Sequence, residues 1–115
     1  MQKGLYCVRY EIEDRSNDLL FLTDNYQDAK KFYHKKVKEL KNNPKLDFAF
    51  THKNDYLGDF VMGTTFTDDD FLSYDVRFSN EMWYDNGLLY HGDGTAEEMT
   101  EEDFLKTLEN YRKLA

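Results

Sequence analysis

The chain contains one cysteine, one proline and no long hydrophobic run, and each of these scarcities excludes a class of protein. The single cysteine, Cys7, excludes an internal disulfide framework and a zinc site with several cysteine ligands. No segment approaches the roughly 20 consecutive apolar residues of a membrane-spanning helix. The first residues also lack the continuous apolar stretch of a signal peptide. We therefore expect a cytoplasmic protein that does not associate with membranes.

The chain also lacks internal repeats and Gly/Ser-rich linkers, so we expect one domain spanning residues 1–115. Its hydrophobic content is 40%, and it includes nine Phe, nine Tyr and one Trp. Disordered chains contain few aromatic residues, so this composition predicts a folded domain with a core of its own.

The charge of the chain is unevenly distributed. The net charge is −8, but residues 1–57 hold eleven Lys and Arg against nine Asp and Glu, whereas residues 58–115 hold four against fourteen. Between residues 54 and 105, fourteen carboxylates accompany one base, Arg77. Such an excess either keeps a protein soluble or forms a surface that binds a basic partner, and both interpretations stay open here.

Polar and apolar residues alternate along several segments, as they do in half-buried strands. A first hairpin is expected over residues 5–22, with its turn at 14–17. Three further strands follow over residues 46–51, 60–66 and 72–78. A second hairpin covers residues 81–91 around Asn86-Gly87, the pair that a type I′ turn requires. We expect the apolar face of the resulting sheet to pack against both helices; its members include Tyr6, Val8, Phe48, Phe50, Tyr74 and Val76.

Two segments show the spacing of amphipathic helices. The first covers residues 26–40, where Asp24 is the expected N-cap and Gln27 completes a capping box. This helix ends before Pro44, which pushes the preceding residue out of the helical conformation. The second helix begins after Thr100, whose hydroxyl is placed to cap it. The order β-β-α-β-β-β-β-β-α predicts an α+β fold with two helices and a mainly antiparallel sheet of about five to seven strands.

Residues with catalytic chemistry are scattered along the chain. We expect His34, His52 and Cys7 to be dispensable, because they lie on a lysine-rich helix face, in a turn and on a mixed strand face. The segment His91-Gly92-Asp93-Gly94 combines a base with flexible backbone, which an active site could use. A link between a hairpin and a helix needs the same flexibility, and we favour this turn interpretation. No catalytic residue is therefore assigned.

Metal and cofactor motifs are incomplete. Asp68, Asp69 and Asp70 are adjacent, whereas calcium loops place oxygen ligands at alternating positions and add a glycine and a distal glutamate. Neither Gly58 nor Gly63 precedes the Lys-Ser/Thr and helix of a phosphate-binding loop. We therefore expect no metal site and no cofactor.

Direct binding of nucleic acid is also not expected. The first helix carries a basic stripe of Lys30, Lys31, Lys35, Lys38 and Lys41, and such stripes can contact phosphates. The net charge of −8 opposes that attraction over the rest of the molecule, and a solvated helix face has the same composition.

The acidic half fits the opposite role, as a surface that occupies a basic groove. A compact chain of this length is roughly 35 Å across, and duplex DNA of that length presents about 10 of its roughly 20 phosphates to one partner. The net excess of thirteen negative charges between residues 54 and 105 is of that order. Aromatic residues, which are enriched at interfaces, lie among them. The expected partner-binding residues are Asp59, Asp68, Asp69, Asp70, Asp75, Glu81, Trp83, Tyr84, Asp85, Tyr90 and Asp93.

In its size, its acidity and its lack of a catalytic motif, the chain resembles small inhibitors from phages and mobile elements, such as anti-CRISPR and anti-restriction proteins. This resemblance is one of composition and rests on no shared motif. It implies a non-enzymatic inhibitor that docks on a basic protein surface, in particular that of a nucleic-acid-binding protein. Two alternatives remain. One is a homo-oligomeric domain, for example a homodimer, or an accessory interaction domain whose charge serves solubility only. The other is a small enzyme with a pocket near His91 and Asp93.

Overall fold

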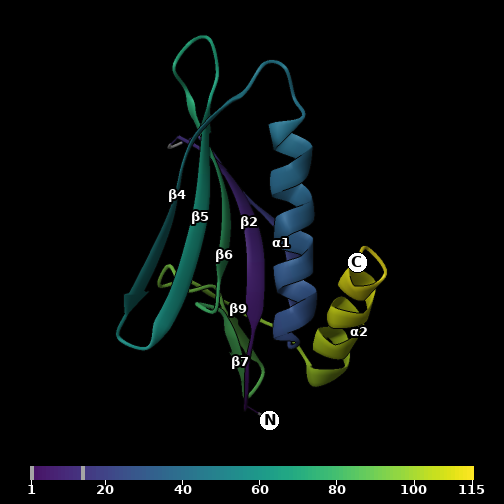
Figure 1. Cartoon of the computed structure of the whole chain (residues 1–115). Coiled ribbons are helices and arrows are strands. Elements are labelled where there is room, and N and C mark those ends of the chain that lie inside the picture. Colours follow the sequence, from purple (N-terminus) through teal and green to yellow (C-terminus); the bar gives the residue numbers. More distant parts are fainter. Residues whose placement is uncertain (1, 14) are drawn as a thin grey trace.

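The computed structural model describes residues 2–13 and 15–115 and shows an α+β fold of two antiparallel sheets and two helices (Figure 1). This confirms the predicted fold class. The described residues form nine strands, which is more than the five to seven expected. The two extra strands are three residues long and belong to a second, smaller sheet that the sequence did not predict.

The large sheet has five strands in the order β3-β2-β6-β5-β4. Every neighbouring pair is antiparallel, as the short hairpin connections predict. Strands β4 and β5 form a long hairpin, and β3 and β4 lie at the two edges. The bounds are Tyr6–Ile12 for β2, Ser16–Thr23 for β3, Asp47–Tyr56 for β4, Asp59–Thr67 for β5 and Ser73–Ser79 for β6.

Helix α1 (Tyr26–Lys41) covers one face of the large sheet and forms the main core with it. The helix contributes the buried residues Ala29, Phe32, Tyr33 and Val37, which recur at helical spacing. From the sheet, alternate residues of each strand face them, since successive side chains point to opposite sides. The sheet residues buried in this core are Val8, Phe21, Phe66, Val76 and Phe78.

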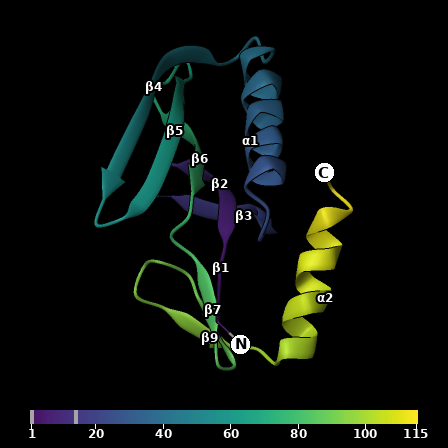
Figure 2. The ribbon, with the colours of Figure 1, turned by 60° about the horizontal axis from the view of Figure 1, so that its bottom comes forward.

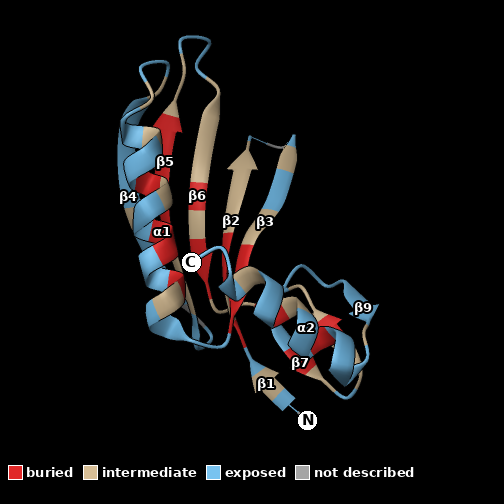
Figure 3. Cartoon of the chain, turned by 90° about the vertical axis from the view of Figure 1, so that its right-hand side faces the viewer, coloured by how far each residue is buried: buried red, intermediate tan, exposed pale blue. Residues whose placement is uncertain are grey.

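The second core lies under a smaller sheet with the strand order β1-β7-β8-β9. Its strands are β1 (Gln2–Gly4), β7 (Trp83–Asp85), β8 (Leu88–Tyr90) and β9 (Ala96–Glu98), and helix α2 (Glu101–Arg112) packs beside them. We call these four strands and α2 the small lobe. Figures 2 and 3 show the small lobe at one end of the large sheet. Its core consists of Leu5, Cys7, Leu22, Met82, Tyr84, Leu89, Phe104 and Leu108.

The expectation that both helices pack against one apolar sheet face is therefore wrong. Helix α1 covers the face of the large sheet that holds the main core, while α2 shares its core mainly with the small sheet and reaches the large sheet at its edge strand β3. Tyr111 of α2 packs against both cores and connects them. Its ring meets Phe21 edge-on, with 6.3 Å between ring centroids.

Phe48 and Phe50 also depart from the prediction, because they do not share a face. A β-bulge lies between them, so that Phe48 pairs with Phe66 while Phe50 pairs with the next residue, Thr65. The extra residue moves Phe50 to the face opposite α1. The two side chains are 51% and 53% exposed, so neither belongs to the core.

The N-caps and the turn of the structure lie at the predicted positions or one residue from them. Asn25, and not Asp24, caps α1, because its side chain accepts a hydrogen bond from the Asp28 backbone N–H. Thr100 caps α2 through the Asp103 N–H, as predicted. The Asn86-Gly87 turn is also confirmed, with positive φ angles of 49° and 84°.

Candidate functional site

The structure separates the expected partner-binding residues into two groups at opposite ends of the large sheet. Asp68, Asp69 and Asp70 form the loop between β5 and β6. The other group lies at or near the small lobe, beyond the far end of β6, and β6 alone spans about 20 Å at 3.3 Å per residue. This second group consists of Asp59, Glu81, Trp83, Asp85, Tyr90 and Asp93.

Two of the expected residues belong to neither group. Asp75 lies within β6, and its carboxylate accepts a hydrogen bond from the Thr65 hydroxyl. Tyr84 is only 2% exposed, because its ring stacks on Phe104 and its hydroxyl donates to the Met99 carbonyl oxygen. The expectation that Tyr84 contacts a partner is therefore corrected, since its side chain builds the core of the small lobe.

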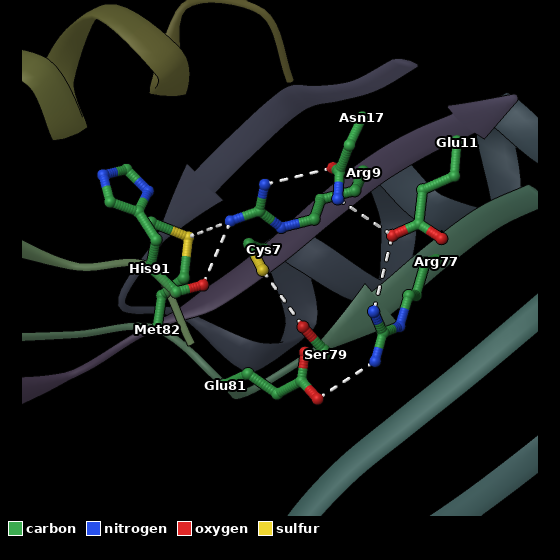
Figure 4. A network of polar contacts seen from close by, with 9 residues as sticks. All are labelled: Cys7, Arg9, Glu11, Asn17, Arg77, Ser79, Glu81, Met82 and His91. Atoms are coloured by element: carbon green, nitrogen blue, oxygen red, sulfur yellow. Dashed lines mark hydrogen bonds and ion pairs between the residues drawn. The ribbon is translucent and has the colours of Figure 1, made fainter. Parts of the chain in front are cut away.

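A row of polar side chains joins the large sheet to the small lobe (Figure 4). Arg77 forms ion pairs with Glu11 (3.4 Å) and Glu81 (3.0 Å), and all three side chains are about 24–30% exposed. Arg9 donates to the Met82 sulfur (3.2 Å) and to the His91 carbonyl oxygen (3.3 Å), on either side of the β7–β8 hairpin. Both guanidinium groups are thus used within the chain, and the row serves to fix the lobe in place.

A small cavity lies beside this row and contains the segment that the sequence marked as an alternative enzyme site. It measures about 130 Å³, below the roughly 300 Å³ at which ligand clefts begin. His91 turns its backbone carbonyl towards Arg9, while its imidazole Nε2 lies 3.5 Å from Glu97 Oε1. The cavity is lined by Arg9, Asn17, Arg77, Glu81, His91, Gly92 and Asp93.

Asp93 is committed to its own loop. Its carboxylate accepts hydrogen bonds from the hydroxyl and the backbone N–H of Thr95, and these bonds hold the pKa of Asp93 below its usual value. The segment 91–95 closes a β8–β9 hairpin in which the His91 N–H bonds the Thr95 carbonyl. The segment thus forms a turn, although it leads into β9 before the chain reaches the helix.

Cys7 and His52 both lie on the face of the large sheet opposite α1. Cys7 is 1% exposed, its sulfur lies 3.1 Å from the Ser79 hydroxyl, and burial raises the pKa of its thiol. A buried, protonated thiol is a poor nucleophile. The His52 ring occupies the space that a side chain at Gly63 would need, so its visible role is packing.

The three adjacent aspartates build a loop and do not converge on a metal site. One oxygen of Asp68 accepts hydrogen bonds from the backbone N–H groups of Asp70 and Leu72, both at 2.9 Å, and the other accepts the Tyr74 hydroxyl at 2.7 Å. These bonds, the one from Tyr74 first, lower the pKa of Asp68. Within residues 2–13 and 15–115 no group of three His, Cys, Asp or Glu side chains is arranged to hold a metal ion.

Acidic residues are concentrated in and beside the small lobe. Residues 81–105 contain eight carboxylates and neither Lys nor Arg. Of these eight, Glu81 is the one for which the described residues supply an Arg or Lys partner within 4.0 Å. The acidic excess is visible in the sequence, but Glu97, Glu98, Glu101, Glu102 and Asp103 were not among the expected partner-binding residues. All five are exposed.

The outer face of the small sheet combines this charge with aromatic surface. Trp83 and Tyr90 stack face to face across β7 and β8, with 4.6 Å between ring centroids, and Trp83 is 40% exposed. Asp85, Leu88 and Glu98 lie on the same face, because the strand register places them opposite one another. Alternate residues such as Tyr84 and Leu89 point the other way, into the core.

A broad groove runs beside this face, between the β7–β8 turn and the start of α2. Its volume is about 610 Å³, and Leu88 and Met99 supply apolar surface beside the carboxylates of Glu98 and Asp103. The exposed lysines of α1 lie elsewhere, on the side of the helix that faces away from the large sheet.

Comparison of the chain with protein-family models, curated proteins and solved structures gives no match. In the part of the chain that the structure describes, no helix is long and apolar enough to cross a membrane.

Proposed function

We propose that this protein is a non-enzymatic binding protein whose small lobe docks on a basic surface of a partner protein. The observation that carries this proposal is the cluster of eight carboxylates in residues 81–105, without a single Lys or Arg among them. Such a surface attracts a cationic partner through a long-range field and accelerates encounter.

The aromatic pair supports docking as well as attraction. Interfaces are depleted in charge at their centre and enriched in Trp and Tyr, while charged residues occupy the rim. The small lobe has this arrangement, because Trp83 and Tyr90 are flanked by Asp85 and Glu98 on one sheet face. The carboxylates then steer the partner, and the aromatic pair supplies apolar contact.

The number of carboxylates, compared with the number of phosphates on DNA of similar length, favours a nucleic-acid-binding cleft as the partner surface. The molecule measures 45 × 29 × 23 Å, and the lobe lies at one end of it. The mean of the two shorter dimensions is about 26 Å, and duplex DNA of that length carries about 15 phosphates, of which about half face one partner. The eight carboxylates match that number. The protein thus acts as an inhibitor that occupies the cleft in place of nucleic acid.

The test compares two double charge reversals of equal size. Glu97→Lys with Glu98→Lys alters the small lobe, and Asp69→Lys with Asp70→Lys alters the β5–β6 loop; all four residues are exposed. Immobilised wild-type protein and both variants are presented to a lysate of the source cells and washed at rising salt. We expect wild type and the loop variant to retain the same partner at low salt, and the lobe variant to lose it.

Association rates of the purified partner complete the experiment. The lobe variant should associate at least tenfold more slowly at low salt, with a smaller difference at high salt, because salt screens exposed charges beyond about 8 Å. Added duplex DNA or RNA should compete for the partner. Equal rates for wild type and the lobe variant, with a slower loop variant, would assign binding to the wrong end of the molecule.

A further inference from the structure

Two cavities meet at Tyr10, near the C-terminal end of α1 and the β5–β6 loop. Figures 1 and 3 show that end of the helix and that loop at the same end of the large sheet. The larger cavity has a volume of about 350 Å³, within the range of about 300–1,000 Å³ typical of small-molecule sites, and the smaller one has a volume of about 180 Å³. A small ligand therefore has room here, and the residues that line the two cavities indicate its chemistry.

The smaller cavity has a mainly apolar lining. Its two charged residues, Lys36 and Glu39, form an ion pair of 3.1 Å with each other, so they leave no net charge. A short hydrocarbon chain is favoured in such a space, because its transfer out of water is favourable. The apolar lining comes from three strands and from α1, and consists of Tyr10, Leu20, Leu40 and Val76.

The larger cavity combines aromatic rings with acidic charge. Tyr10 and Tyr74 line it, and their rings stack with 6.2 Å between centroids. Asp69 and Asp70 line it as well, and neither has a Lys, Arg or His within 4.0 Å among the residues that the structure describes. The face of a tyrosine ring attracts a cation, and so does a carboxylate without an ion-pair partner.

The balance of charge in the larger cavity also favours a cation over an anion. Three aspartates line it against one base, Lys45. Asn43, one residue beyond the C-cap of α1, is a further lining residue, and the C-terminal end of a helix favours positive charge. The aspartates do not converge as ligands of a metal ion must, so an organic cation fits this lining better than a metal.

We propose that these two cavities bind a small free amine with a short apolar chain. Its ammonium group lies in the larger cavity, beside the Tyr10–Tyr74 pair and the carboxylates of Asp69 and Asp70, and its chain lies in the smaller cavity. The proposal does not rest on the function proposed for the small lobe, which lies at the other end of the large sheet.

Three probes of equal chain length test the role of charge. In an NMR titration of the wild type, n-hexylammonium should shift the ring resonances of Tyr10 and Tyr74 and the methyl resonances of Leu40. The neutral n-hexanol and the anionic hexanoate should bind at least tenfold more weakly. Shortening the amine to n-butylammonium should weaken binding about two- to fourfold for each CH₂ removed, because less apolar surface is buried.

Two variants locate the ammonium group and the chain. Asp69→Asn with Asp70→Asn should weaken n-hexylammonium binding at least fivefold, while Glu97→Gln with Glu98→Gln removes the same charge from the small lobe and should leave binding unchanged. All four residues are exposed. Leu40→Ala should weaken the binding of n-hexylammonium but not that of methylammonium, which has no chain to place in the smaller cavity.

A further probe separates a free amine from a lysine of a protein partner. Nα-acetyl-lysine methylamide carries a butylammonium group on a peptide backbone, and burial of its amides in an apolar cavity is costly. It should bind at least tenfold more weakly than n-hexylammonium, and equal binding would overturn the proposal in favour of a lysine side chain.

The proposal is also overturned if n-hexylammonium leaves the three sets of resonances unchanged, if n-hexanol or hexanoate binds as tightly, or if the Asp69 and Asp70 variant binds as the wild type does. The comparison of probes uses the unaltered protein, so it decides even where a variant fails to fold.

Discussion

Phe50 and Phe78 are phenylalanines on strands of the same sheet, but their environments differ completely. Phe78 is fully buried and lies within 6.2 Å, centroid to centroid, of the rings of Tyr6, Tyr26, Tyr33 and Phe60. Phe50 is 53% exposed and has His52 as its aromatic neighbour. Burial, and not residue type, therefore decides what each ring contributes to stability.

We predict that Phe78→Ala lowers the free energy of unfolding by about 3–5 kcal/mol, the usual loss for a buried phenylalanine. Phe50→Ala should lower it by less than about 1 kcal/mol, because most of its ring is already in water. Urea unfolding measures both. A loss of 3 kcal/mol or more for Phe50→Ala would mean that β4 lacks the bulge.

Asp68 permits a pH prediction at the scale of one carboxylate. The hydrogen bond from the Tyr74 hydroxyl is the main cause of its lowered pKa. A carboxylate with a lowered folded-state pKa stabilises the fold above its unfolded value, near 3.9, and this contribution disappears as pH falls through the folded value. The β5–β6 loop should therefore loosen only in acid.

NMR titration of the Asp68 carboxyl group measures this effect. We expect a midpoint below that of an aspartate in an unstructured peptide, and Tyr74→Phe should move the midpoint upwards. Tyr10→Phe is the matched control, since the Tyr10 ring stacks against Tyr74 while Asp68 bonds the Tyr74 hydroxyl. Equal upward shifts in both variants would point to packing of the rings as the cause.

At the scale of the element, the start of α1 shows that the local sequence does not decide which of two adjacent residues caps the helix. Asp24 and Asn25 are both good capping residues, and the two positions differ only in backbone conformation and in where the side chain points. The Asp24 carboxylate forms an ion pair with Lys3, with 2.8 Å between Oδ2 and Nζ. The Asn25 side chain instead accepts the hydrogen bond from the Asp28 backbone N–H. A tertiary contact with β1 thus decides which residue caps the helix.

We predict that Asn25→Ala lowers the free energy of unfolding by about 1 kcal/mol, as the loss of an N-cap does. Asp24→Ala should cost less than about 1 kcal/mol, because an exposed ion pair contributes little. Thermal or urea unfolding of the two variants gives the comparison. A larger loss for Asp24→Ala would restore the capping box with Gln27 that the sequence predicts.

Elements with a long local pattern were predictable. Seven strands and both helices lie where alternation, helical spacing, Thr100 and the Asn86-Gly87 turn predict them. Strands β1 and β9 were missed because three residues are too few to show a period of two. The bulge in β4 was missed because an inserted residue leaves the order of polar and apolar residues unchanged, while it reverses the face of every residue before it.

The candidate site was predictable only as a charge excess. The sequence gathers acidic residues into one window, but the β5–β6 connection carries Asp68 to the opposite end of the sheet from Asp59. Conversely, β9 and the first turn of α2 bring Glu98 and Asp103 to one groove. Which acidic residues lie together depends on the order of strands in the sheet, and a charge count over a sequence segment holds no information about that order.

At the scale of the whole molecule, the distribution of charge has a consequence for stability that is independent of any partner. Eight carboxylates lie within residues 81–105, in and beside the small lobe of a molecule whose shorter dimensions are 29 and 23 Å. Two like charges 10 Å apart in water repel by about 0.4 kcal/mol. Folding brings these groups closer together, so mutual repulsion opposes the folded state.

We predict that adding NaCl raises the unfolding temperature of the wild type. The double variant Glu97→Gln with Glu98→Gln should have a free energy of unfolding about 0.5–1 kcal/mol higher than that of the wild type at low salt. The stability of this variant should also depend less on salt. These two residues lie on β9, which has little dipole. Glu101, Glu102 and Asp103 are unsuitable, because they also stabilise the positive end of α2. Lys30→Gln with Lys35→Gln is the matched control, and removal of those positive charges should not stabilise the protein. If NaCl has no effect on wild type while the glutamine variant gains nothing, the carboxylates of the lobe lie too far apart to repel, and the small lobe would then lack the concentrated field that its proposed docking requires.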